Sequence, residues 1–247
     1  MKNVLVVLLL SIFVFGCSGS KETIDMSAEE HLAYAMEMYN NEDYQFSIRE
    51  FQSIILQFPG NIVNDDAQYY LAMSYFNDEQ YLLAAYEFSK LIRDIKGSEF
   101  VSMSQFMLAE SYYQLSPPYQ LEQSYTNKAI AEFQAFLDFF PVDPKGEEAE
   151  RKIIELNLKL AEKLFESAQI YEKMEYFNAS MGYYTKVYET YHDTKYAPMA
   201  LYKKINILLE KERISDAVDN MKLFLTKYPD SEFALEIQNL FDELSIN

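Results

Sequence analysis

Three segments of this chain share one pattern: His31-Leu-Ala-Tyr-Ala-Met-Glu-Met-Tyr39, Gln68-Tyr-Tyr-Leu-Ala-Met-Ser-Tyr-Phe76 and Gln105-Phe-Met-Leu-Ala-Glu-Ser-Tyr-Tyr113. Each segment begins 37 residues after the previous one, so the alanines at their fifth positions fall in register. A fixed period of this length is typical of repeat proteins, in which one unit cannot bury its apolar face alone and must stack on a neighbour. The period therefore predicts a stack of repeats.

A second helix is expected after each of these first helices. Residues 44–51 align with residues 81–88, and both segments carry a small residue and a phenylalanine at helical spacing. In the third repeat the corresponding Phe133 comes only after an insertion around Pro117-Pro118. Proline interrupts helices because it lacks a backbone N–H, so the insertion is expected to be a loop between two helices.

The remaining chain continues the pattern less regularly. Ala179 to Tyr183 predicts a fourth second helix, and Ala217 to Pro229 predicts a fifth. The stretch Glu147 to Lys173 contains no helix breaker and predicts one long first helix for the fourth hairpin. With a last helix at about 232–244, the expected fold class is all-α, a solenoid of five helical hairpins and a short C-terminal helix.

The pattern resembles the tetratricopeptide repeat. That family has small residues at the eighth and twentieth positions, aromatic residues at the eleventh and twenty-fourth, and proline near the thirty-second. Ala35, Ser47, Phe51 and Pro59 match in the first repeat, where Met38 replaces the first aromatic residue. Small residues allow two helices to approach closely, and an aromatic ring from the neighbouring helix fills the remaining space.

The N-terminus predicts export and lipidation. An apolar run at residues 4–15 follows Lys2; it is too short to span a bilayer and is typical of a signal peptide. The run ends in Val14-Phe15-Gly16-Cys17, which resembles a bacterial lipobox. That resemblance implies removal of residues 1–16, acylation of Cys17 by chains such as palmitate, and a tether at 17–26. Ser18, where some lipoproteins have Asp, implies transfer to the outer membrane.

The net charge of −18 argues against a nucleic-acid partner, because a polyanion requires a basic surface. The charge is uneven. From Asp25 to Asp143 there are 19 acidic and 5 basic side chains, and from Pro144 to Asn247 there are 19 and 14. Either the acidic groups form solvated helix faces, or two halves meet different partners. We therefore divide the repeats into residues 27–143, with repeats 1–3, and 144–247, with repeats 4–5 and the end helix.

No catalytic or metal-binding motif is recognisable. The two histidines, His31 and His192, lie far apart in sequence, and Cys17 is the only cysteine. Zinc sites require several such ligands at defined spacings, and no phosphate-binding loop or nucleophile motif is present. The sequence thus predicts a binding scaffold that is not an enzyme and uses no cofactor or metal.

A ladder of large apolar side chains is expected along the concave face. In the tetratricopeptide family, the fifth, ninth and twelfth positions of each first helix face the groove. These positions hold Leu32, Met36 and Tyr39, then Tyr69, Met73 and Phe76, then Phe106, Glu110 and Tyr113. The ladder is either packing between hairpins or a groove for an extended peptide with aromatic side chains, since aromatic residues and methionine bury much area.

The combination resembles the BamD family, also called YfiO or ComL. The resemblance rests on Cys17, five hairpins, the proline-containing insertion, and Leu160-Ala-Glu-Lys163 on the long helix. It implies an outer-membrane lipoprotein facing the periplasm that binds a BamA-like barrel protein, other assembly subunits and unfolded outer-membrane proteins. By the same analogy the C-terminal hairpins dock the partner, through a basic cluster of Lys203, Lys204, Lys211 and Arg213.

Other functions remain open at this point. A nutrient-binding partner of an outer-membrane transporter would also use these repeats, but the chain contains no tryptophan for stacking on sugars. A coordination scaffold of the cell envelope is a further possibility. A lytic transglycosylase would need an additional catalytic domain, for which no residues remain.

Overall fold

The computed structural model describes residues 25–245, which contain eleven α-helices and no β-strand. The helices are α2 (Ala28–Asn40), α3 (Tyr44–Gln57), α4 (Asn64–Asn77), α5 (Tyr81–Asp94), α6 (Val101–Gln114), α7 (Ser124–Phe139), α8 (Gly146–Lys173), α9 (Phe177–Thr190), α10 (Tyr196–Glu210), α11 (Ile214–Lys227) and α12 (Ala234–Ser245). The predicted lipidation site Cys17 lies outside the described residues.

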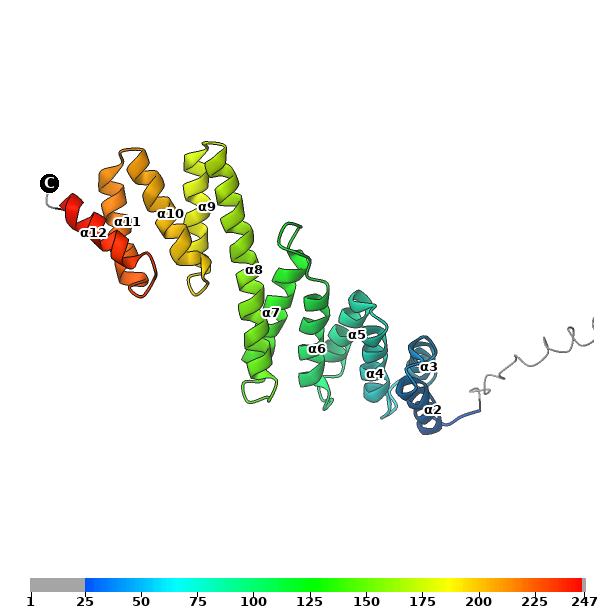
Figure 1. The fold of residues 1–247 in the computed structure, drawn as a ribbon. Coiled ribbons are helices and arrows are strands. Elements are labelled where there is room, and N and C mark those ends of the chain that lie inside the picture. Colours follow the sequence, from blue (N-terminus) through cyan, green and yellow to red (C-terminus); the bar gives the residue numbers. More distant parts are fainter. Residues whose placement is uncertain (1–24, 246–247) are drawn as a thin grey trace, which may run out of the picture.

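The helices form antiparallel pairs that stack in one row from α2 at one end to α12 at the other (Figure 1). The pairs are α2–α3, α4–α5, α6–α7, α8–α9 and α10–α11, and α12 packs on α11. In the part of the chain that the structure describes, this confirms the predicted solenoid of five hairpins and an end helix. None of these helices is long and apolar enough to cross a membrane.

The core follows the small-and-aromatic pattern. Three small residues of the first helices are fully buried, and so are three phenylalanines of the second helices; they are Ala35, Ala72, Ala109, Phe51, Phe88 and Phe133. Close approach at alanine leaves room that the phenylalanine rings fill, and filling it removes large apolar areas from water. The same pattern of small and aromatic residues therefore accounts for the core positions of all three hairpins.

Helix α9, the second helix of the fourth hairpin, lies where the sequence predicted it. Its buried small and aromatic residues, however, come one position later than predicted. The buried small residue is Ser180 and the buried aromatic ring is Tyr184, whereas Ala179 and Tyr183 are only half-buried. Tyr184 is fully buried and donates a hydrogen bond to Glu172. Two adjacent Ala-Ser and Tyr-Tyr pairs left the register ambiguous in sequence, and packing against α8 selects the second member of each.

Helix α8 joins two parts of the solenoid. It has 28 residues, twice the 14 of α9, and at 1.5 Å per residue it is about 42 Å long. Leu156 of α8 belongs to the core that contains Phe133, and Phe165 further along α8 belongs to the core that contains Tyr184. The last two hairpins are consequently displaced along α8 relative to the first three (Figure 1).

Four of the five hairpins turn on a glutamate in the left-handed backbone region. These residues are Glu42, Glu79, Glu175 and Glu212, with φ values of 62°, 60°, 62° and 55°. Glycine is the residue that adopts this conformation without steric cost, so each glutamate carries some backbone strain. Because this geometry recurs, the glutamates mark equivalent positions in the repeats of both halves. Glu79 thus corresponds to Glu175 and to Glu212.

The third hairpin has the inserted loop in place of this turn, between Gln114 and Ser124. Lysines of α8 hold the loop. The Lys163 ammonium donates to the carbonyl oxygens of Tyr119 at 3.0 Å and Leu121 at 2.7 Å, and Lys159 donates to the Ser116 hydroxyl at 2.9 Å. The insertion is thus fastened to the helix that begins the second half.

Candidate functional site

The histidine at position 31 has a structural role. In the first three hairpins, one polar residue of the first helix contacts a glutamate of the second, an arrangement we call the polar clamp. Nε2 of His31 lies 2.8 Å from a carboxylate oxygen of Glu50, and the His31 side chain is fully buried. The other histidine, His192, is exposed beside Asp193, and no group of His, Cys, Asp and Glu in the described residues could hold a metal ion.

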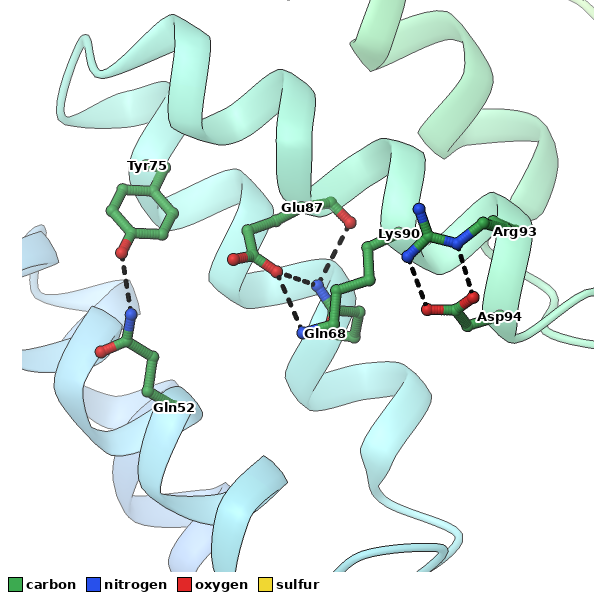
Figure 2. Close-up of polar contacts among 7 residues, drawn as sticks. All are labelled: Gln52, Gln68, Tyr75, Glu87, Lys90, Arg93 and Asp94. Carbon is green, nitrogen blue, oxygen red and sulfur yellow. Dashed lines mark hydrogen bonds and ion pairs between the residues drawn. The ribbon is translucent and has the colours of Figure 1, made fainter.

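Figure 2 shows the polar clamp of the second hairpin, where the Gln68 amide donates to both the backbone carbonyl and the carboxylate of Glu87, at 3.1 and 2.7 Å. Gln105 makes the same two contacts with Glu132 in the third hairpin. The polar clamp was not predicted from the sequence. Its signal was present, because glutamine recurs at the same register position 37 residues apart.

The first two rungs of the predicted ladder lie together at the surface of the first core. Their six side chains are half-buried and pack against it; they are Leu32, Met36, Tyr39, Tyr69, Met73 and Phe76. Half-burial means that each side chain contributes to packing between hairpins and still presents apolar area to solvent. Packing and binding are therefore compatible at these six positions.

The aromatic rings of these rungs are held in fixed positions. The Tyr39 hydroxyl accepts a hydrogen bond from the Asn77 amide at 3.0 Å, which ties the first hairpin to the second. Tyr69 stacks on Phe100, with ring centroids 4.4 Å apart, and burial raises the pKa of Tyr69 to about 12. A surface of preorganised rings loses little conformational freedom when a ligand binds to it.

The third rung differs, because α8 lies against it. Phe106 is buried at 2% exposure and packs edge-on against Phe133, so we leave it out of the candidate groove. Glu110 pairs with Lys152 of α8 at 2.7 Å. Tyr113 donates to Glu155 of α8 at 2.8 Å, and burial together with this carboxylate raises the pKa of Tyr113 to about 12. Tyr113 thus marks the closed end of a surface two rungs wide.

The basic cluster predicted for partner docking is divided around α10. Lys203 lies 3.6 Å from Glu172 of α8, on the side of the first helices. Lys204 donates to the Tyr188 hydroxyl of α9 at 2.9 Å, on the side of the second helices. Successive helix residues point about 100° apart, so neighbours in sequence face different helices.

Lys211 and Arg213 lie at the turn between α10 and α11. The Lys211 ammonium is 3.6 Å from the centroid of the Phe177 ring, a cation–π contact, and Arg213 pairs with Asp216. Both basic residues line an open hollow of about 630 Å³ whose walls include Phe177 and Met181. The hollow combines apolar walls with two basic side chains and the acidic Glu175.

The YfiO family model, described as an outer membrane lipoprotein, matches residues 24–210. No match was found among curated proteins.

Among solved structures, a tetratricopeptide-repeat protein from Bacteroides fragilis is 13% identical, with 89% of this chain and 98% of that chain covered and a TM-score of 0.47. The TPR2AB domain of yeast Sti1, in a complex with pHSP90, is 13% identical, with 88% of this chain and 98% of that chain covered and a TM-score of 0.41.

Proposed function

Because the chain belongs to the YfiO family of outer membrane lipoproteins, we propose that it is a lipid-anchored scaffold of the machinery that assembles β-barrel proteins in the outer membrane. In this proposal the lipid is attached to Cys17 and the hairpins face the periplasm. Residues 27–143 bind segments of unfolded outer-membrane proteins, and residues 144–247 dock a BamA-like barrel protein. The family match over residues 24–210 is the observation that carries the proposal.

The substrate surface that we propose consists of the first two rungs. Its six half-buried side chains offer aromatic and thioether groups to an apolar or aromatic segment. Exposed acidic side chains such as Glu29 and Glu37 lie on the same helix, so negatively charged segments are disfavoured. Barrel segments that end in an aromatic residue are suitable ligands for such a surface.

Replacement of Phe76 by alanine tests the substrate surface. Phe76 is half-buried and makes a ring contact with Tyr81 at 5.2 Å, so its removal takes away apolar contact area. We expect Phe76→Ala to weaken binding of a labelled, aromatic-ended barrel peptide about tenfold, which corresponds to about 1.4 kcal/mol. Fluorescence anisotropy measures the binding, and a thermal melt of each variant reports on folding.

Tyr86→Ala is the matched control, because Tyr86 is an exposed aromatic residue of α5 outside the ladder. Its peptide affinity should equal that of the parent protein. If Phe76→Ala is folded and binds the peptide as tightly as Tyr86→Ala, the ladder side chains serve packing between hairpins and do not bind the peptide.

Charge reversal tests the docking half. Lys203→Glu and Lys211→Glu should each reduce crosslinked co-purification of a BamA-like barrel protein from membranes, because an acidic side chain there repels partner carboxylates. Each reversal also removes a contact within the protein, that of Lys203 with Glu172 and that of Lys211 with Phe177, so a thermal melt of each variant reports on folding. Lys222→Glu, at an exposed lysine of α11, is the control. Unchanged co-purification in both test variants would reject these residues as docking contacts.

The anchor has its own test. Cys17→Ala should abolish labelling by an alkyne analogue of palmitate and should move the protein from the membrane fraction to the soluble fraction. Labelling that persists in Cys17→Ala would place the acyl group elsewhere.

A further inference from the structure

The first three hairpins have two dissimilar edges. At one edge the chain passes from one hairpin to the next, through residues 58–63, 95–100 and 140–145, and the first turn of α2 lies at this edge too (Figure 1). We call it the crossover edge. At the opposite edge the chain turns within the first two hairpins, through residues 41–43 and 78–80.

Large apolar side chains project from the crossover edge. Val142 is 95% exposed, Ile62 84%, Leu56 80% and Phe139 74%. Ile62 and Val142 lie in crossover loops, and Leu56 and Phe139 lie in the last turns of α3 and α7. None of the four belongs to a hydrophobic core among the described residues, so the packing of the chain does not explain them.

The two within-hairpin turns on the opposite edge are polar throughout. They read Asn41-Glu42-Asp43 and Asp78-Glu79-Gln80. The first turns of α3 and α5 beside these loops carry Phe46, Leu82 and Leu83, which are 45%, 53% and 44% exposed, less than any of the four side chains at the crossover edge. The crossover edge is therefore the more strongly apolar of the two. Large apolar side chains that are this exposed favour a phase that removes them from water.

We propose that the crossover edge rests on the surface of the bilayer to which the chain is anchored, with Leu56, Ile62, Phe139 and Val142 entering the headgroup region. The proposal rests on the lipid anchor at Cys17. Nine residues separate Cys17 from the N-cap residue Ser27. The ten residue-to-residue steps from Cys17 to Ser27, at 3.3 to 3.6 Å each, reach at most about 35 Å, so the anchored terminus keeps the first turn of α2, which lies at this edge, within that distance of the lipid.

The charges of the crossover edge determine which lipid headgroups it can approach. The acidic side chains in its loops and in the first turn of α2 are Glu29, Glu30, Glu99 and Asp143, whereas the basic ones are Lys96 and Lys145. Arg93 and Asp94 pair with each other at 2.8 Å. An edge with this acidic excess is repelled by anionic headgroups. We therefore expect the crossover edge to contact a zwitterionic lipid surface, and anionic lipid should weaken this contact.

A tryptophan introduced at the edge reports on lipid contact without background, because the chain contains no tryptophan. Single variants Ile62→Trp and Val142→Trp test the crossover edge. Tyr176→Trp is the control, since Tyr176 is 58% exposed at the turn before α9, beyond the far end of α8. Each full-length variant is extracted from membranes and reconstituted into phosphatidylcholine vesicles with brominated acyl chains.

Ile62→Trp and Val142→Trp should show blue-shifted emission that brominated lipid quenches, while Tyr176→Trp should remain unquenched. Replacing part of the phosphatidylcholine by phosphatidylglycerol should reduce the quenching at both edge positions. Absence of quenching at positions 62 and 142, or equal quenching at 176, would overturn the proposal. So would crosslinking of the two edge positions to a protein in membranes, which would assign the edge to that partner.

A second preparation separates this proposal from the lipidation proposal. The thiol of Cys17, the only cysteine, is coupled to a maleimide lipid in a chain that begins at this residue, so that anchoring no longer depends on the cell. If the coupled chain is quenched at positions 62 and 142 but the extracted chain does not float with vesicles, the anchor assignment fails and the edge assignment holds. If the coupled chain floats without quenching, the edge assignment fails.

Discussion

The first three and the last two hairpins share one backbone register, but they carry different kinds of side chain at equivalent positions. At the position of Gln68, counted from the turn glutamates, the fourth and fifth hairpins have Leu164 and Leu201. At the position of Glu87 they have Tyr183 and Asn220. The polar clamp of the first half is therefore absent from the second, where Leu164, Tyr183 and Leu201 belong to the hydrophobic cores.

This difference shows how one repeat serves two kinds of surface. In the first half, the polar clamp joins the two helices of a hairpin, and large apolar side chains of the first two rungs lie half-exposed. In the second half, leucine fills the interface, and the surface carries lysine and arginine. Both solutions occur on the same hairpin backbone, so neither is required by the hairpin itself.

The largest change in stability is expected when the glutamine of the polar clamp replaces the leucine at the equivalent position of the fifth hairpin. Leu201 is fully buried among Tyr188, Phe224 and Ile237. Leu201→Gln leaves a buried amide without a partner and should lower the free energy of unfolding by about 3 kcal/mol, measured by urea denaturation. Leu201→Met is the control and should cost less than about 1.5 kcal/mol. A loss for Leu201→Gln no greater than that of the control would mean that the interface accepts a polar residue.

Detaching the insertion from α8 should have a smaller effect. Lys163→Met removes the charged donor of the loop carbonyls and should cost about 1.5 kcal/mol. Limited proteolysis should then cut within residues 115–123 faster than in the parent protein. Lys173→Met, at an exposed lysine of the same helix, should leave the cleavage rate unchanged. Equal rates in both variants would show that Lys163 does not hold the loop.

Removing one polar clamp should cost about 1 kcal/mol. Gln68→Leu leaves the Glu87 carboxylate, 13% exposed, with Lys90 at 3.5 Å as its remaining partner. The double variant Gln68→Leu, Glu87→Tyr introduces the residues of the fourth hairpin and should recover stability in thermal melts. If the double variant is less stable than Gln68→Leu alone, the two interfaces are not interchangeable.

The smallest change in stability is expected at the turn glutamates, where replacement by glycine should stabilise the protein in both halves. Glu79→Gly and Glu212→Gly remove the strain of a positive φ and should each raise the free energy of unfolding by about 0.5 kcal/mol. Differential scanning calorimetry at matched protein concentration measures the change. A decrease in either variant would mean that the glutamate side chain stabilises its turn.

The helices and most of the core could be predicted because they depend on local patterns. Alanine and phenylalanine at a fixed period predict which side chains are buried, and proline and the insertion predict where helices end. The register of α9 could not be predicted, because Ala179-Ser180 and Tyr183-Tyr184 satisfy the pattern equally well.

The candidate site was less predictable, because it depends on contacts between distant segments. The burial of Phe106 and the closure at Tyr113 require the path of α8, which follows from no local pattern. The division of Lys203 from Lys204 follows from helical geometry and could have been foreseen once α10 was assigned. The domain boundary at residues 143 and 144 remains a proposal about binding, because α8 packs on both sides of it.

Helix α8 also has a consequence for folding cooperativity. Leu156 and Phe165 lie on one continuous helix but in two cores, so melting either core exposes one side of the same helix and breaks its backbone hydrogen bonds. In a stack of repeats, such strong coupling between neighbours makes partly unfolded states rare. Heat or urea should therefore unfold both halves in a single transition, so that the chain is one folding unit with two chemically distinct surfaces.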